Sequence, residues 1–309
     1  MTQSLAFVFP GQGSQQVGML SALAEEHAII TDTFAEASEA LGYDLWALVQ
    51  DGPAETLNQT QKTQPALLTA GVALWRLWQA QGGDQPAYMA GHSLGEYTAL
   101  VCAGVISLAD GVRLVEQRGI FMQEAVPTGT GAMAAILGLA DDLVAQACES
   151  AAQEQVVSPV NYNCPGQIVI AGEKDAVERA IVACKEAGAK RAVPLPVSVP
   201  SHCSLMKPAA ERMAALLNDI AFSMPTIPVL QNVDAAQPAD LDALKANLLA
   251  QLYSPVLWTN TVQTLVELGI EKTVECGPGK VLSGLNKKVH KPLAVMAISE
   301  PEGLAKALA

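Results

Sequence analysis

The strongest constraint on the fold is a short apolar run at residues 86–90 that ends at Gly91 and is followed at once by a helical pattern at 94–102. The junction, Gly91-His-Ser-Leu-Gly95, fits the nucleophile-elbow pattern Gly-x-Ser-x-Gly. Its glycines keep Cβ atoms away from a sharp turn, and the helix N-terminus places free N–H groups beside the hydroxyl. The alternative is a tight turn whose serine only caps the helix. Ser93 is therefore a candidate nucleophile.

Strand and helix patterns alternate around this junction. A buried strand at residues 5–9 stops at Pro10-Gly11, and helical patterns occupy about 17–41, 64–81 and 108–125. This alternation predicts an α/β domain with a mainly parallel sheet. The chain has 309 residues and half are hydrophobic, which is enough for one large domain with a small insert.

The middle of the chain has a different pattern. Pro127 and the Thr-Gly-Thr-Gly stretch at 128–131 resemble a linker. Six predicted elements follow in the order β-α-β-β-α-β, at 132–138, 141–152, 156–162, 167–171, 174–187 and 191–197. That order is typical of a ferredoxin-like unit. We expect a ferredoxin-like subdomain at 128–197, inserted into a catalytic domain formed by 1–127 and 198–309.

A catalytic serine needs a base, and the chain offers four histidines: His27, His92, His202 and His290. His27 and His290 lie in charged stretches typical of a surface, and His92 adjoins Ser93 on the turn, where neighbouring side chains diverge. His202 follows a proline-stiffened segment at 194–200, which suits the rigid placement of a general base. A catalytic thiol at Cys203 lacks an elbow of its own. His202 is the candidate base.

Arg118 projects from the apolar face of the helical pattern at 108–125, because Leu114, Val115, Phe121 and Met122 lie three and four residues away. An unpaired guanidinium on that face is costly. Either a buried carboxylate pairs with it, or it receives an anionic group of the substrate, for which its planar fork is suited. Beside a serine nucleophile, the second reading implies an acyl group with a free carboxylate, such as malonyl.

Bulk properties exclude other classes of function. A net charge of −13 disfavours nucleic-acid binding. No apolar run is long enough for a membrane helix, and the N-terminus lacks the basic region of a signal peptide. Six scattered cysteines without a Cys-x-x-Cys pair indicate reduced thiols and no zinc site. We therefore expect a cytoplasmic protein that binds neither nucleic acid nor membrane.

Several motifs together resemble the malonyl-CoA:acyl carrier protein transacylases of bacterial type II fatty-acid synthesis. The matching segments occur in the family's order and span the chain: Phe9-Pro-Gly-Gln-Gly-Ser-Gln15, Gly91-His-Ser-Leu-Gly-Glu-Tyr97, Gln117-Arg-Gly119, Asn163-Cys-Pro-Gly-Gln167, Val199-Pro-Ser-His202 and Glu275-Cys-Gly-Pro-Gly-Lys280. The resemblance implies an α/β-hydrolase-like domain with a ferredoxin-like insert. It also implies an acyltransferase that moves malonyl from malonyl-CoA to the phosphopantetheine thiol of acyl carrier protein through a malonyl-serine intermediate.

The same resemblance implies a role for each candidate residue. Ser93 is the nucleophile and His202 its base, with the imidazole oriented by the main-chain carbonyl of Gln251. The backbone N–H groups of Gln12 and Leu94 form the oxyanion hole.

Arg118 grips the malonyl carboxylate in this reading, and no metal or resident cofactor is required. Asn161 or Asn163 lines the cleft, a choice left open by the sequence. We expect a monomer.

Three other functions share parts of this pattern. The segment Val199-Pro-Ser-His202 departs from the His-Ala-Phe-His of modular polyketide acyltransferases, so their extender-unit code does not transfer. A polyketide acyltransferase acting in trans differs only in its acceptor. A serine hydrolase shares the elbow but has no use for a buried Arg118, and a silent carrier-protein-binding module needs neither Ser93 nor His202.

Overall fold

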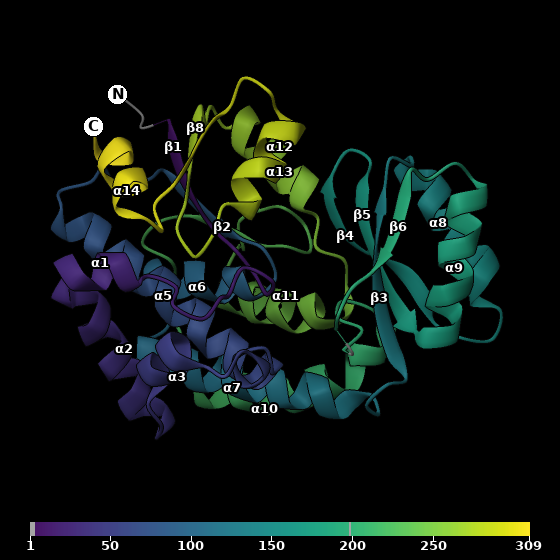
Figure 1. The fold of residues 1–309 in the computed structure, drawn as a ribbon, viewed down its shortest axis with the longest axis horizontal. Coiled ribbons are helices and arrows are strands. Elements are labelled where there is room, and N and C mark those ends of the chain that lie inside the picture. Colours follow the sequence, from purple (N-terminus) through teal and green to yellow (C-terminus); the bar gives the residue numbers. More distant parts are fainter. Residues whose placement is uncertain (1–3, 198) are drawn as a thin grey trace.

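The computed structural model describes residues 4–197 and 199–309. Two sheets organise these residues, one parallel and one antiparallel, and they lie side by side in Figure 1. The fold is therefore mixed α/β, as the alternation of patterns predicts.

The parallel sheet has five strands in the order β7-β2-β1-β8-β9. Its strands are β1 (Leu5–Phe9), β2 (Tyr88–Gly91), β7 (Val229–Leu230), β8 (Lys272–Glu275) and β9 (Ala294–Ala297). All five residues of β1 are buried, as expected for a central parallel strand covered on both faces. Phe9 pairs with Gly91, so the loops that follow β1 and β2 leave the sheet at the same edge.

Helices cover both faces of this sheet and form, with it, what we call the parallel-sheet unit. They are α1 (Ser21–Glu26), α2 (Ala28–Leu41), α3 (Leu45–Asp51), α4 (Ala54–Leu57), α5 (Thr60–Ala80), α6 (Leu94–Cys102), α7 (Leu108–Ala125), the 3₁₀ turn η1 (Ser204–Met206), α10 (Lys207–Asp219), α11 (Leu241–Tyr253), α12 (Trp258–Glu267), α13 (Val281–Val289) and α14 (Pro301–Leu308). Two apolar clusters, one on each face of the sheet, form its core.

The antiparallel sheet has four strands in the order β4-β5-β3-β6. With two helices it forms the antiparallel-sheet unit: β3 (Gly131–Leu137), α8 (Asp141–Ala152), β4 (Val157–Cys164), β5 (Gln167–Glu173), α9 (Lys174–Glu186) and β6 (Arg191–Pro194). Figure 1 shows α8 and α9 on the side of the sheet that faces away from the parallel-sheet unit. The other face carries a small apolar cluster that includes Cys203, the neighbour of His202.

Element types follow the sequence patterns closely, and the differences lie at boundaries. The helical pattern at 17–41 is two helices, because His27 is extended between α1 and α2. The strand expected at 191–197 ends at Pro194, since proline has no N–H to donate to the sheet. Residue 198, at which the second part of the expected catalytic domain begins, lies outside the described residues.

Candidate active site

Ser93 occupies the sharp turn between β2 and α6. Its backbone lies in a strained region at φ 53° and ψ −109°. A Cβ atom on Gly91 would overlap the backbone of Gly95, and one on Gly95 would overlap the carbonyl oxygen of Phe9. The glycines on both sides of the serine are therefore required by the close approach of β1, β2 and α6.

Two side chains hold this strained turn. The backbone N–H of Ser93 donates to Oδ1 of Asn232 at 2.7 Å, and the carbonyl of Ser93 accepts from Nε2 of Gln251 at 3.0 Å. Asn232 also donates from Nδ2 to the carbonyl of Gly91 at 2.6 Å. Asn232 comes directly after β7, the sheet neighbour of β2, so the sheet brings it to the elbow. The sequence analysis did not identify Asn232.

His202 and Ser93 form a dyad. Nε2 of His202 lies 2.8 Å from Oγ of Ser93, and Nδ1 lies 2.7 Å from the main-chain oxygen of Gln251. Because a carbonyl only accepts, Nδ1 carries the proton and Nε2 is left to accept from the serine hydroxyl. Burial and the positive charge of Arg118 lower the pKa of His202 to about 3, so the imidazole is neutral at pH 7 and can act as a base.

Arg118 is completely buried beside the dyad. Its Nη1 donates to Oε1 of Gln64 at 2.7 Å, and its Nη2 donates to Oε1 of Gln251 at 3.0 Å and lies 3.4 Å from Oγ of Ser93. Among the residues described, no carboxylate lies within 4.0 Å of the guanidinium, and Nε has no hydrogen-bond partner. The buried ion pair considered from the sequence is therefore wrong, and the fork is open to an anionic group.

The two residues expected to form the oxyanion hole come from the loop after β1 and from the elbow itself. Gln12 follows β1, and the N–H of His92 donates to the carbonyl of Phe9 at 2.9 Å, which ties the two loops together. The side chain of Gln12 accepts from Oγ1 of Thr60 at 2.8 Å. Leu94 is the first residue of α6, where a backbone N–H has no acceptor within its own helix.

Glu96 lies in the first turn of α6 and is completely buried. Its carboxylate accepts from the backbone N–H of Asn232 at 2.8 Å, from Nε2 of Gln231 at 3.1 Å and from Nε2 of Gln251 at 3.1 Å. Burial raises the pKa of Glu96 to about 7, although these three donors act in the opposite direction. The sequence suggests only that an acidic residue suits the helix dipole here, whereas the structure links Glu96 to the loop after β7 and to α11.

His92 points away from Ser93, toward the antiparallel-sheet unit. Its Nε2 lies 2.8 Å from Oδ1 of Asn163 on β4. Asn161 instead forms an isolated backbone bridge with Val256. Of the two asparagines left open by the sequence, Asn163 is the one whose side chain reaches the residue next to the nucleophile.

The remaining sequence candidates lie outside this group. Sγ of Cys203 contacts the carbonyl oxygen of Pro200 at 3.1 Å and takes no part in the dyad. Within residues 4–197 and 199–309, no three His, Cys, Asp or Glu side chains are grouped as metal ligands, and no helix is long and apolar enough to span a membrane.

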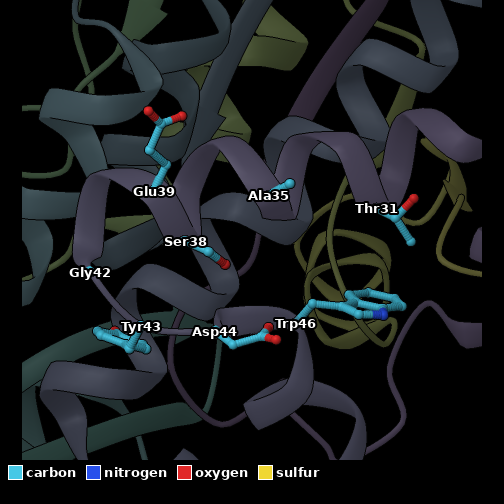
Figure 2. Close-up of a pocket in the computed structure, with 8 residues that line it drawn as sticks. All are labelled: Thr31, Ala35, Ser38, Glu39, Gly42, Tyr43, Asp44 and Trp46. Atoms are coloured by element: carbon cyan, nitrogen blue, oxygen red, sulfur yellow. The ribbon is translucent and has the colours of Figure 1, made fainter.

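A separate open pocket of about 550 Å³ lies between α2 and α3 (Figure 2). It is lined by Thr31, Ala35, Ser38, Glu39, Gly42, Tyr43, Asp44 and Trp46. None of these residues belongs to the elbow, the dyad or the surroundings of Arg118, so the pocket is distinct from the candidate active site.

Comparison with known proteins gives a consistent result. The model of the acyl transferase domain matches residues 6–298. The malonyl CoA-acyl carrier protein transacylases of Salmonella typhimurium and Escherichia coli are each 64% identical over 308 residues, covering 100% of this chain and 99% of each relative. A crystal structure of an acyl carrier protein S-malonyltransferase from Vibrio cholerae superposes with a TM-score of 0.97 at 62% identity and covers 98% of this chain and 99% of its own.

A further solved structure includes a partner. It holds a type II polyketide acyl-carrier protein in complex with its malonyl-transacylase, which is 57% identical to this chain, with a TM-score of 0.97 and coverage of 98% of both chains. The motifs, the two sheets and these full-length similarities agree. The chain belongs to the acyl transferase domain family, among the malonyl CoA-acyl carrier protein transacylases.

Proposed function

We propose that this protein transfers a malonyl group from coenzyme A to acyl carrier protein through a malonyl ester on Ser93. The observation that carries the proposal is the grouping of a serine hydroxyl, a neutral imidazole and an open guanidinium. Oγ of Ser93 lies 2.8 Å from Nε2 of His202 and 3.4 Å from Nη2 of Arg118. The names of the relatives, malonyl CoA-acyl carrier protein transacylases, support the same donor and acceptor.

In the first half-reaction, Nε2 of His202 takes the proton of Ser93 as Oγ attacks the thioester carbon of malonyl-CoA. The carbonyl oxygen becomes an oxyanion, which the backbone N–H groups of Gln12 and Leu94 receive. The carbon–sulfur bond then breaks, and the protonated His202 gives its proton to the departing thiolate of coenzyme A. The main-chain oxygen of Gln251, 2.7 Å from Nδ1, supports the positive charge on the imidazole between the two proton transfers.

In the second half-reaction, the thiol of the carrier's phosphopantetheine arm replaces coenzyme A. His202 accepts its proton, the sulfur attacks the ester carbon, and Oγ of Ser93 leaves and recovers the proton. The sequence is a ping-pong exchange in which one acyl group moves between two thiols. No atom changes oxidation state and His202 carries the proton in both halves, so no step of the proposal calls for a metal or a resident cofactor.

Arg118 selects the acyl group in this mechanism. A carboxylate at the far end of the group on Ser93 meets a guanidinium that has no carboxylate within 4.0 Å among the described residues. Arg118 also distinguishes the transferase from a hydrolase of neutral esters, for which a buried cation next to the nucleophile has no use. The serine hydrolase is therefore the weaker alternative.

The physiological acceptor in this proposal is the carrier protein of fatty-acid synthesis. A trans-acting polyketide acyltransferase is the second candidate, because one relative was solved with a type II polyketide carrier protein. The two functions share every step at Ser93 and differ only in the carrier protein that accepts the malonyl group. Competition between a purified fatty-acid carrier protein and a purified polyketide carrier protein for one malonyl-enzyme therefore distinguishes the two functions.

The architecture fits the same proposal. The order β3-α8-β4-β5-α9-β6 and the strand order β4-β5-β3-β6 support a ferredoxin-like subdomain at 128–197. The elbow at the end of β2 supports an α/β-hydrolase-like domain formed by 1–127 and 198–309. We include in the proposal a monomer that works in the cytoplasm.

The decisive experiment is intact-mass analysis of the protein after mixing with malonyl-CoA, followed by addition of holo carrier protein. The expected result is a malonyl adduct that is absent in Ser93→Ala and that passes to the carrier thiol. No adduct on the unmodified chain, or an adduct of equal yield in Ser93→Ala, would overturn the proposal.

A further inference from the structure

Glu96 makes three hydrogen bonds that the two half-reactions do not use. All three are accepted from N–H groups, those of Asn232, Gln231 and Gln251. A protonated carboxyl group would need an acceptor for its O–H. These three contacts favour the ionised form and so oppose the burial that raises the pKa of Glu96 to about 7.

Arg118 is the matching buried positive charge, and the side chain of Gln251 lies between the two. Its Oε1 accepts from Nη2 of Arg118 at 3.0 Å, and its Nε2 donates to the carboxylate of Glu96 at 3.1 Å. The amide thus presents its oxygen to the cation and its N–H to the anion, and the charges at its two ends keep it from flipping. Arg118 and Glu96 are therefore linked through one amide and do not touch each other directly.

This connection resolves a conflict at the acyl site. A carboxylate in direct contact would occupy the fork of Arg118, whereas a buried guanidinium without a counter-charge would be costly. A counter-charge one amide away balances the guanidinium and leaves its fork open. We propose that Glu96 is a positioning residue for acyl-group selection, which acts through Gln251 to hold Arg118 open beside Ser93; this inference rests on the proposed function.

Glu96 also reaches the elbow by a second route. Its carboxylate binds the backbone N–H of Asn232, and the side chain of Asn232 holds the N–H of Ser93. Losing the hydrogen bond to Asn232 slows acylation by every acyl group equally, because Ser93 attacks them all. Losing the hydrogen bond to Gln251 slows acylation only by acyl groups with a free carboxylate, because it acts on Arg118. The two routes are therefore separated by comparing malonyl with acetyl.

The test is Glu96→Gln, followed by single-turnover acylation of Ser93 with malonyl-CoA and with acetyl-CoA, read by intact mass. The introduced amide keeps one oxygen, so its NH₂ group replaces either the oxygen that accepts from Gln231 or the oxygen that accepts from Asn232 and Gln251. In both orientations the negative charge that balances Arg118 is lost. The expected result is a fall in the malonyl-to-acetyl ratio of roughly 10- to 100-fold, the range for losing one hydrogen bond in a charged network. The ratio does not depend on the fraction of folded protein.

Glu275→Gln is the matched control. Glu275 is another buried carboxylate of the parallel-sheet unit, but it accepts from the backbone N–H groups of Leu282 and Ser283 at the start of α13. Its loss weakens a helix end and leaves the malonyl-to-acetyl ratio unchanged. If Glu96→Gln does not fold, Gln251→Met removes the bridging amide and keeps the main-chain oxygen for His202, and the same fall in the ratio is expected.

An equal loss for both acyl groups, or no loss, in Glu96→Gln overturns the inference and leaves Glu96 as a support of the elbow alone. A change of ratio in Glu275→Gln as large as that in Glu96→Gln also overturns it. Failure of the proposed function has a different signature, since the unmodified chain then forms no malonyl adduct at all. If the unmodified chain is acylated and the ratios do not move, only the inference is lost.

Discussion

The guanidinium Nη2 of Arg118 lies 3.4 Å from the hydroxyl oxygen of Ser93, although the two residues belong to different helical segments. Ser93 directly precedes α6, and Arg118 lies in the middle of α7. An acyl group bound to Ser93 therefore has a buried cation within reach of its far end. This relationship is the physical basis of the specificity that we propose.

Removing the guanidinium should separate the two acyl groups. In Arg118→Ala we expect malonyl transfer to fall about 10- to 100-fold further than acetyl transfer, because only malonyl loses a charge-assisted contact. Arg118→Lys keeps the charge without the planar fork and should give an intermediate loss. The measurement is acylation kinetics with both thioesters. Equal losses for malonyl and acetyl would contradict the carboxylate grip.

Removing the base should slow both half-reactions. In His202→Ala we expect the rate of Ser93 acylation to fall about 10²- to 10⁴-fold, the usual contribution of a general base. Cys203→Ala is the matched control, because its thiol is adjacent in sequence but its hydrogen bond goes to the carbonyl of Pro200 and not to the dyad. Its rate per folded molecule should stay within the range of the unmodified protein. A loss in Cys203→Ala equal to that in His202→Ala would restore the thiol as a candidate.

The lowered pKa of His202 also predicts how stability depends on pH. The folded-state value of about 3 lies below the ordinary 6.5, so between these pH values the unfolded chain binds a proton that the folded chain does not. The contribution of neutral His202 to stability is therefore fully present above 6.5 and is lost as the pH falls toward 3, with a slope of at most about 1.4 kcal/mol per pH unit.

Urea unfolding of the unmodified protein and of His202→Ala, at about pH 7, 6 and 5, measures this effect. As the pH falls, the unfolding free energy of the unmodified protein should decrease relative to that of His202→Ala. Glu96 and every other titrating group common to both proteins largely cancel in that difference. A difference that stays constant with pH would mean that His202 titrates normally in the folded state.

The glycines of the elbow should tolerate no side chain. In Gly95→Ala the new Cβ overlaps the carbonyl oxygen of Phe9, and we expect a loss of at least about 3 kcal/mol of stability. Gly284→Ala, within α13, is the control, since no atom lies within 4 Å of its added Cβ and alanine favours a helix by about 1 kcal/mol. Urea unfolding compares them. Similar stabilities for the two variants would contradict the close packing at the elbow.

Local patterns were sufficient to predict the elements that present the site. The helices α6 and α7 begin and end at the predicted residues, and α7 has a local starting signal. For α7 that signal is Ser107, whose hydroxyl accepts from the N–H of Asp110 at 3.0 Å. The apolar neighbours of Arg118 also predicted its burial correctly, since helical spacing alone determines the face on which it lies.

Contacts between distant loops could not be predicted in this way. Asn232 reaches Ser93 across 139 residues of sequence and Glu96 across 136, and nothing near either residue indicates the partner. The same limit left a buried carboxylate partner for Arg118 open from its own surroundings in the sequence, whereas the structure places the amides of Gln64 and Gln251 against it. One available signal was overlooked: Gln231 and Asn232 are polar residues directly after an apolar strand, a common place for a site in a parallel sheet.

Both members of the dyad have left-handed backbone conformations, at φ 53° for Ser93 and φ 67° for His202. Each such residue costs on the order of 1–3 kcal/mol and persists only where its surroundings hold it. The hydrogen bonds that hold them come from within the protein itself: Asn232 and Gln251 bind the backbone of Ser93, and the carbonyl of Leu252 accepts from the N–H of His202. The strain of positioning the hydroxyl and the imidazole is therefore part of the free energy of folding. The binding energy of either thioester is not needed to assemble the two groups at each turnover.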